Sequence, residues 1–244
     1  TKNFVNIHET GKILDEEYKN AIVFPLVIEK EIKGLIFTMN KIVKDDKFET
    51  NFVESDETIV RTLNKLVAAV WESIHLFELA TIDSLSKLYV RRYFEKTFEE
   101  EIRKSSRNNT KLSLVMIDID NLQKCNINYG HFVGDQVIRQ VSESIKDSIG
   151  DLDLASRYGG EKFTILMTEQ SSNDACDLAE KIRENIQNIE VAVPIGENLK
   201  ITVSCGVSSF PENGSTVEEL IRNAEEALYK AKQEGRNNVL LAII

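Results

Sequence analysis

The sequence has 244 residues, of which 42% are hydrophobic and 29% are charged, and its formal net charge is -10. This hydrophobic fraction is enough for packed cores in one large or two smaller domains, and it excludes an intrinsically disordered chain. An acidic chain without a basic run is a poor candidate for binding nucleic acid or an anionic membrane surface, so we expect neither partner.

No apolar run approaches the roughly 20 residues that a membrane-spanning helix needs, and no signal peptide is recognisable. We therefore expect no membrane segment in this chain and a cytoplasmic location. The cysteines follow no metal-ligand spacing and are expected to be reduced thiols: Cys125, Cys176 and Cys205. The chain opens at Thr1 within sequence that already has a folded pattern, so we expect a longer parent protein.

Residues 20–43 have the pattern of two strands around a polar turn, with Pro25 early in the first strand and Gly34 at the start of the second. This short pattern resembles the later strands of a GAF-type sensor domain, and a PAS-like or unrelated sheet is the alternative. We assign residues 1–53 to the C-terminal part of a GAF-like sensor domain whose ligand is unknown.

Residues 54–82 have helical periodicity without an interrupting Gly or Pro, and Ser55 and Asp56 are candidate caps at the start. Apolar residues in this segment follow steps of three and four that approach a heptad seam: Ile59, Leu63, Leu66, Val70, Ile74 and Phe77. Two interpretations stay open. The helix packs on its own sheet domain, or it pairs with a second copy and transmits a signal to the following domain.

Residues 83–244 alternate helix and strand patterns around one hairpin, which is typical of an α/β sandwich of the ferredoxin-like, palm-type class. We expect helices at 89–107, 134–149, 173–189 and 216–235. We expect strands at 111–120, 200–210 and 237–244, and the hairpin at 152–167.

Two acids end the buried strand pattern of residues 111–120. Asp118 and Asp120 stand two positions apart, so they face the same side of a strand. Buried carboxylates are unfavourable unless a cation compensates their charge, and a hard divalent ion such as Mg²⁺ is the usual cation. The alternative is that these acids cap the helix that follows.

The hairpin supplies a third acid. Gly159-Gly160 is a strong turn signal, because both residues can adopt a positive φ, and the missing side chains let a ligand approach the backbone. Glu161 follows directly. If the hairpin lies beside the Asp118 strand, Glu161 and Asp118 can share a metal ion; a plain surface hairpin is the alternative.

Four ordered blocks over residues 81–244 make this part of the chain similar to the GGDEF family, the diguanylate cyclases of bacterial signalling. The signature loop reads Gly-Gly-Glu-Lys-Phe at 159–163, after Arg157-Tyr158. Residues 118–135 resemble the pattern D-I-D-x-F-K-x-x-N-D-x-x-G-H-x-x-G-D, and residues 227–239 resemble A-L-Y-x-A-K-x-x-G-R-N. Residues 80–94 resemble the opening motif D-x-L-T-G-L-x-N-R-R.

The resemblance implies condensation of two GTP molecules into cyclic di-GMP with release of two pyrophosphates. Each subunit of a homodimer would hold one GTP, and the 3′-hydroxyl of one would attack the α-phosphate of the other. Mg²⁺ or Mn²⁺ is the implied cofactor. The N-terminal sensor region would control the enzyme through the long helix.

The resemblance also implies roles for individual residues. Asp118 and Glu161 would be catalytic and would bind the metal together with the Ile119 carbonyl. The implied substrate-binding residues are Asn126, Asp135, Gly159, Gly160, Lys232 and Arg236. A carboxylate at position 135 suits guanine, because it accepts from N1–H and N2–H together, and adenine offers no such pair. The alternative for the last two residues is that they complement the helix dipole.

Several positions depart from the family pattern. Gln123 stands where a phosphate-binding Lys is common, Leu122 replaces Phe and Ile127 replaces Asp. The opening motif has Ser86, Lys87 and Val90 in place of Thr, Gly and Asn.

Lys162 replaces the second acid of the signature, and three interpretations stay open for it. It points to solvent; it faces the triphosphate and substitutes for the Lys missing at position 123; or it repels the metal ion. A unit charge pair at ~4 Å and an effective dielectric of ~20 interacts by on the order of 4 kcal/mol before screening, so the third possibility would be damaging.

Many members of the family carry R-x-x-D before the signature as an inhibitory product site. Here the aligned stretch has Gly150 in place of Arg and retains Asp153, so we expect no inhibitory site. The leading hypothesis is a diguanylate cyclase. The alternative is a degenerate domain that binds GTP or a partner protein without cyclase activity, because Lys162 and Gln123 replace usual site residues.

Overall fold

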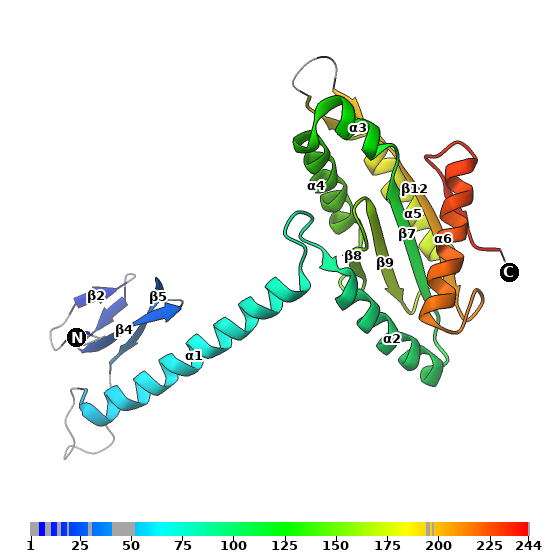
Figure 1. Cartoon of the computed structure of the whole chain (residues 1–244). Coiled ribbons are helices and arrows are strands. Elements are labelled where there is room, and N and C mark those ends of the chain that lie inside the picture. Colours follow the sequence, from blue (N-terminus) through cyan, green and yellow to red (C-terminus); the bar gives the residue numbers. More distant parts are fainter. Residues whose placement is uncertain are drawn as a thin grey trace. The chain divides into compact units, whose positions relative to one another are not determined.

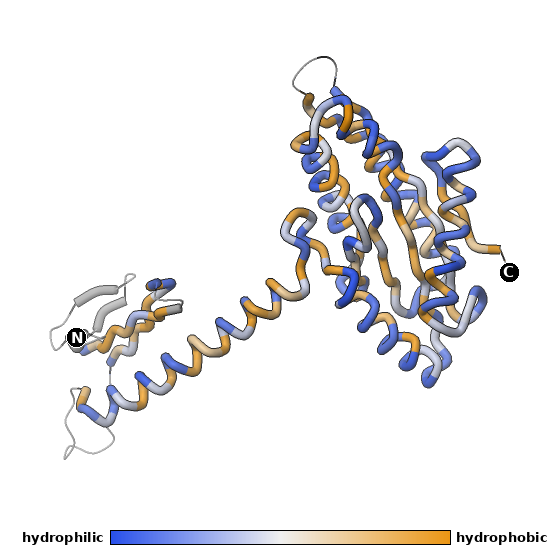
Figure 2. The backbone as a smooth tube through the Cα atoms, viewed as in Figure 1, coloured by the Kyte–Doolittle hydropathy of each residue, from blue (hydrophilic) through white to orange (hydrophobic). Residues whose placement is uncertain are grey.

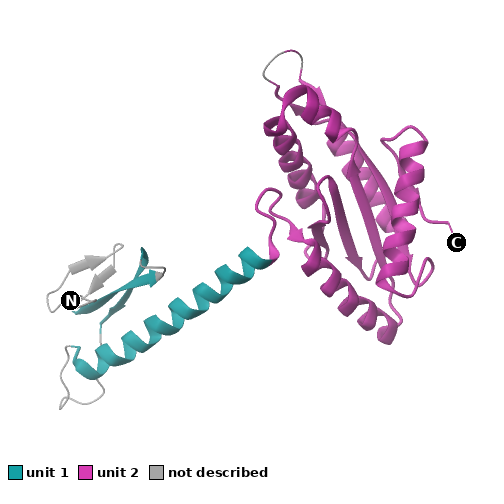
Figure 3. Cartoon of the chain, viewed as in Figure 1, with its two compact units in different colours: residues 1–80 teal, residues 81–244 magenta. Residues whose placement is uncertain are grey.

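The structure is a computed structural model that describes residues 5–7, 11–13, 16–18, 20–28, 31–40, 52–193, 196 and 198–243. The chain divides into two compact units, residues 1–80 and 81–244 (Figure 3). No helix in the described ranges is long and apolar enough to cross a membrane.

The first unit contains a three-stranded antiparallel sheet in the order β1 (Val5–Ile7), β4 (Ala21–Ile28) and β5 (Glu31–Met39). A separate pair is formed by β2 (Gly11–Ile13) and β3 (Glu16–Tyr18). The two predicted strands are therefore confirmed as β4 and β5. Of the predicted range 20–43, residues 29–30 and 41–43 lie outside the described residues.

Helix α1 (Glu54–Thr81) confirms the predicted helix, and its start packs on the sheet of the same unit. Val60 lies in one apolar cluster with Ile22 and Phe24, and Asn64 Nδ2 donates to the Pro25 carbonyl at 3.0 Å. Beyond this contact, the predicted seam is open to solvent within the chain. These five seam residues are between 54% and 59% exposed: Ile59, Leu63, Leu66, Val70 and Ile74.

The helix start differs slightly from the prediction. The helix begins at Glu54, and Asp56 accepts a hydrogen bond from the Val53 backbone N–H at 2.9 Å. Asp56 therefore stabilises the helix N-terminus as a residue of the first turn, and not as the residue that precedes the helix. Figure 2 shows polar and apolar residues interspersed along α1, as expected for a helix with one apolar stripe.

The second unit is a six-stranded mixed sheet in the order β13-β12-β7-β9-β8-β6 (Figure 1). Its strands are β6 (Tyr89–Val90), β7 (Leu112–Ile119), β8 (Leu154–Arg157), β9 (Lys162–Thr168), β12 (Val203–Phe210) and β13 (Val239–Leu241). Its helices are α2 (Arg91–Asn108), α3 (Leu122–Tyr129), α4 (His131–Ser148), α5 (Ser172–Gln187) and α6 (Val217–Gln233). A small antiparallel pair, β10 (Glu190–Val191) and β11 (Leu199–Lys200), lies outside this sheet.

The helices cover both faces of the sheet. One apolar core joins α4 and α5 to Val115 and Ile117 of β7. The other core joins α2 and α6 to Leu114 and Met116. Because side chains alternate along a strand, Asp118 continues the face that α2 and α6 cover. This confirms the predicted α/β sandwich.

Two local predictions differ from the structure. Helix α2 begins at Arg91 rather than at Tyr89, because Tyr89 and Val90 pair with β8 as the edge strand β6. The short helix α3 carries site residues and was not predicted. Its boundaries depend on a left-handed residue at Asn121 and on Gly130 at φ 85°, which an apolar pattern does not reveal.

Candidate active site

Six of the predicted site residues, Asn126, Asp135, Gly159, Gly160, Glu161 and Lys162, line a cleft of about 430 Å³ between α3, α4 and the β8–β9 hairpin. The cleft is lined by Leu122, Asn126, His131, Asp135, Ile138, Arg157, Gly159, Gly160, Glu161 and Lys162. Three segments that are separate in the sequence therefore contribute to one surface. The predicted guanine residues lie in the same cleft as the Gly-Gly turn and Glu161.

Asn126 on α3 and Asp135 on α4 both line the cleft. Asn126 Oδ1 is buried, and no described group hydrogen-bonds to it. The contact with α4 is close at Gly134, where an added Cβ would lie 1.8 Å from Asn126 Oδ1. Glycine at position 134 therefore leaves room for the Asn126 amide, whose buried oxygen is ready for a donor.

The Gly-Gly turn forms the middle of the cleft. The Tyr158 and Gly159 backbone N–H groups both donate to the Lys162 carbonyl, at 2.8 and 3.1 Å. Neither glycine has a positive φ, so this part of the prediction is wrong. A Cβ on Gly160 would meet nothing described within 4 Å, and one on Gly159 would meet only the Lys162 Cβ at 3.9 Å. The missing side chains keep the cleft open rather than permit a special turn.

Arg157 braces this turn, a role that the sequence analysis missed. Its Nη2 donates to the Gly160 carbonyl at 2.8 Å, and its Nη1 donates to Asp83 Oδ1 at 3.1 Å. Burial raises the pKa of Asp83, but hydrogen bonds from Ser86 and Arg157 outweigh it and leave that pKa lowered. Arg157 and Asp83 both lie within motifs that the sequence shows, but the sequence did not indicate that they form a pair.

Asp118 lies at the acidic end of the site and is only 1% exposed. Lys232 Nζ on α6 lies 2.6 Å from its Oδ1. Burial raises the pKa of Asp118, while Lys232 and Lys162 act against that shift. Burial also raises the pKa of Glu161, and the negative charge of Asp118 adds to the increase. Two carboxylates that disfavour each other's charge are a site for a cation.

The donor set fits a hard divalent ion. The Ile119 N–H donates to the Glu161 carbonyl at 3.1 Å, which ties the end of β7 to the residue before β9. Asp118 Oδ1 makes no hydrogen bond of normal geometry with any described group, although Lys232 is close. Within the described residues, no group of three or more His, Cys, Asp or Glu side chains is placed to hold a metal ion. Two carboxylates and a carbonyl suit Mg²⁺, which retains waters and takes substrate phosphates.

Lys162 is placed directly opposite Asp118 in the β7–β9 register, so the two side chains share a face of the sheet. Its Nζ lies 3.2 Å from Glu225 Oε1 on α6. Lys162 therefore does not simply point to solvent. It is a cation in the wall of the cleft, held by an acid that no motif had indicated.

Asp120 has a structural role. It accepts hydrogen bonds from Thr202 Oγ1 at 2.8 Å, Ser204 Oγ at 2.7 Å and the Asn237 N–H at 3.1 Å. These bonds join the end of β7 to β12 and to the segment after α6. Asp120 makes no capping bond to α3, and Asn121 at the N-cap position makes none through its side chain, so the capping alternative is wrong.

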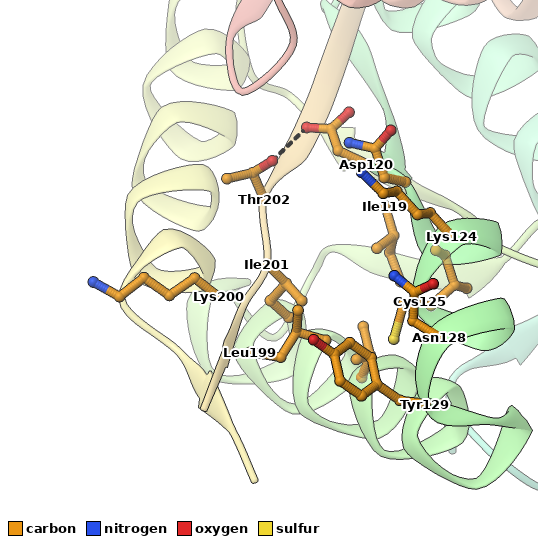
Figure 4. A pocket seen from close by; sticks show the side chains of 13 residues that line it. Ile119, Asp120, Lys124, Cys125, Asn128, Tyr129, Leu199, Lys200, Ile201 and Thr202 are labelled. Carbon is orange, nitrogen blue, oxygen red and sulfur yellow. Dashed lines mark hydrogen bonds between the residues drawn. The ribbon is translucent and has the colours of Figure 1, made fainter. Parts of the chain in front are cut away.

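Figure 4 shows Asp120 and Thr202, joined by a hydrogen bond, at the edge of a second cavity of about 320 Å³. Leu122 lines both cavities, and Cys125 and Tyr129 line only this one. Residues of α3 therefore contribute to both cavities.

The predicted residues Asp118, Ile119 and Lys232 do not themselves line the cleft, and neither do Gln123, Arg236 and Asp153. Gln123 is exposed on α3, and Arg236 is exposed just after α6 with a φ of 67°. Asp153 caps its own turn: its Oδ2 accepts from the Gly150 N–H at 2.9 Å and its Oδ1 accepts from Gln170 at 3.1 Å.

The fold and the cleft define a mixed α/β domain with an acid pair beside a glycine turn. Residues 80–238 match the family model for the diguanylate cyclase GGDEF domain, and the chain belongs to this family.

Comparison with known proteins agrees with this assignment. Diguanylate cyclase A of Treponema denticola is 30% identical over 239 residues, which cover 96% of this chain and 63% of that protein. The response regulator PleD of Caulobacter vibrioides is 36% identical over 246 residues, which cover 98% of this chain and 54% of that protein. The chain thus spans less than two thirds of the length of either relative.

Solved structures agree as well. The coiled coil and GGDEF domain of DgcB from Caulobacter crescentus, in complex with c-di-GMP, matches with a TM-score of 0.70 at 25% identity. The match covers 78% of this chain and all of that one.

Proposed function

We propose that this protein is a diguanylate cyclase, which condenses two GTP molecules into cyclic di-GMP and two pyrophosphates. The observation that carries the proposal is a single cleft lined by Asn126, Asp135 and Glu161, with Asp118 close enough to Glu161 to raise its pKa. The pair Asn126 and Asp135 suits a guanine edge, and the two acids suit a triphosphate with its metal ion.

Each of these residues has a proposed role in binding GTP. Asp135 accepts from guanine N1–H and N2–H, while Asn126 contributes its unpartnered Oδ1. Asp118, Glu161 and the Ile119 carbonyl would hold Mg²⁺ or Mn²⁺, and such an ion would supply positive charge at the triphosphate and lower the pKa of the attacking hydroxyl. Lys232 and Arg236 bind phosphate.

The bond changes need two nucleotides. The 3′-oxygen of one GTP bonds to the α-phosphorus of the other, its proton leaves, and the α–β phosphate bond breaks to release pyrophosphate. A second reciprocal attack closes the ring. One cleft holds half of this reaction, so positioning two clefts against each other is the main task of the protein.

The proposed active form is a homodimer that pairs through α1. The exposed seam supports this, because a row of apolar side chains at helical spacing is stabilised by burial against a second copy. Residues 1–53, which we interpret as part of a GAF-like sensor, would control the distance between the clefts. We place the protein in the cytoplasm, where GTP is available.

The test is GTP turnover by the full chain with Mg²⁺ or Mn²⁺, followed by chromatography of the product. We expect cyclic di-GMP from the wild type and at least about a 10²-fold lower rate from Asp118→Asn. No product at high enzyme concentration would overturn the proposal.

The second candidate function is a degenerate domain that binds nucleotide without turnover, and the placement of Lys162 opposite Asp118 favours it. In that case the wild type binds GTP without forming product, and Lys162→Glu restores turnover. We also propose no product inhibition through Asp153, because its carboxylate is engaged by Gly150 and Gln170. Rates measured with added cyclic di-GMP in the low micromolar range should stay unchanged.

A further inference from the structure

Lys162 stands where the family has an acid, and its surroundings indicate what it does. We infer that Lys162 is a ligand of the substrate triphosphate, and that binding transfers its ammonium group from Glu225 to the phosphates. The inference rests on the proposed function, since it assigns a role within the same cleft.

The position of Lys162 is the first support. Asn126, Asp135, Gly160 and Lys162 line the same cleft. A guanine held by Asn126 and Asp135 would therefore have its phosphates within the cleft that Lys162 also lines. Lys162 also shares its sheet face with Asp118, so its side chain lies on the side where the acids and Lys232 meet.

The second support is that the contact with Glu225 is easily exchanged. The side chains of Lys162 and Glu225 are 40% and 42% exposed, and their N–O distance is 3.2 Å. An exposed pair of this kind contributes little to stability, so releasing Lys162 from it is inexpensive. Phosphate oxygens carry more negative charge than one carboxylate and form stronger charge-assisted hydrogen bonds.

The third support comes from α6. Glu225 and Lys232 are seven residues apart, which is about two turns, and so they lie on one face of the helix. Glu225 contacts Lys162 while Lys232 contacts Asp118. Lys162 and Lys232 thus form two neighbouring ion pairs at the same end of the site. Gln123, in contrast, is exposed on α3. Lys162 supplies the positive charge that position 123 lacks.

The test measures binding rather than turnover. The full-length chain is titrated with guanosine 5′-(α,β-methylene)triphosphate, whose α–β link cannot be cleaved, and separately with GMP, both with Mg²⁺. The variants are Lys162→Met, which keeps the stem of the side chain, Glu225→Gln, and the control Lys230→Met on the exposed surface of α6.

We expect Lys162→Met to weaken triphosphate binding about tenfold and to leave GMP binding unchanged, because only the longer ligand reaches it. Glu225→Gln should strengthen triphosphate binding a few-fold by freeing the lysine, and Lys230→Met should change neither affinity.

Other outcomes show whether the inference alone is wrong or the proposed function as well. Tighter triphosphate binding by Lys162→Met would overturn the inference, since it would show that the lysine repels the metal ion. Unchanged binding would also overturn it and leave Lys162 a surface ion pair. If the wild type binds neither ligand, the proposed function fails first, and the inference fails with it.

Discussion

The two ends of the cleft satisfy their polar groups in different ways. At the proposed guanine end, Asn126 Oδ1 is buried without a described partner. At the phosphate end, Asp118 contacts Lys232 and Lys162 contacts Glu225. The first end is open for its ligand, while the second end must exchange internal ion pairs for ligand contacts.

This difference has an energetic consequence. A buried amide without a partner is unfavourable in the free protein, so a base that donates to it recovers that energy directly. An ion pair that must be broken offsets part of what the phosphates contribute. Base identity should therefore dominate recognition, and the charges should tune affinity and metal use.

The largest expected effect comes from Gly206 on β12, which lets α6 pack against the sheet. An added Cβ would lie 2.1 Å from the Ala224 carbonyl oxygen and 2.4 Å from the Leu228 nitrogen, both backbone atoms. Gly206→Ala should therefore lower the free energy of unfolding by about 3 kcal/mol, the upper end for overpacking. Thermal denaturation measures this.

Gly206→Ala also tests the comparison of the two ends. Helix α6 carries Glu225 and Lys232, so a displacement of this helix should weaken triphosphate binding more than GMP binding. Gly160→Ala is the stability control, because nothing described lies within 4 Å of its Cβ. Equal melting of both variants would contradict the packing argument.

Next in size is the loss of guanine recognition. Asp135→Asn replaces an acceptor-only group by one that also presents N–H donors to the base. We expect GMP affinity to fall by about 10²-fold, because a buried donor on the base is left without its acceptor. Titration with GMP measures this, and Asp118→Asn should bind GMP as the wild type does. A similar loss in both variants would mean that the two ends are not separate.

A smaller effect is expected from Gly134→Ala, which touches no ligand. The new methyl group would displace the Asn126 side chain, whose Oδ1 lies 1.8 Å from the ideal Cβ position. Because the obstacle is the end of a side chain, stability should change little, while GMP affinity falls about tenfold with loss of the amide contact. Combined with Asn126→Ala, the two effects should not add. Additive losses would show that Gly134 acts elsewhere.

The smallest expected effect concerns stability and pH. Burial raises the folded-state pKa of Asp118 and Glu161 above the unfolded values. The folded protein then binds protons more readily, so its stability falls as the pH rises from about 4 through the raised folded pKa values. Asp118→Asn should make that fall shallower and stabilise the ligand-free protein near pH 7 by about 1 kcal/mol.

Urea denaturation at pH 5 and pH 7, without metal ions, measures this difference. Glu100→Gln on the surface of α2 is a suitable control, since that residue is exposed and far along the chain from the cleft. A lower stability of Asp118→Asn at pH 7 would mean that the contact with Lys232 more than offsets the burial of the carboxylate.

Much of the site could be predicted because its motifs are local. The two-residue spacing of Asp118 and Asp120 indicates a strand end, and Gly159-Gly160 indicates the hairpin that the register confirms. Even so, the two acids have different surroundings. Asp118 faces Lys232, while Asp120 is held by Thr202 and Ser204. Identical residues on one strand end could not be separated without knowing their neighbours.

By itself, the sequence determined the alternation of helices and strands, the long α1 and the identity of the acids, because these depend on periodicity and short motifs. Only the tertiary structure decided which group is the partner of each charged side chain. Glu225 and Asp83 contact Lys162 and Arg157 of the site from distant segments, and the register alone sets Lys162 opposite Asp118. Charge partners depend on distances of a few ångström between elements, and those distances follow from packing rather than from spacing along the chain.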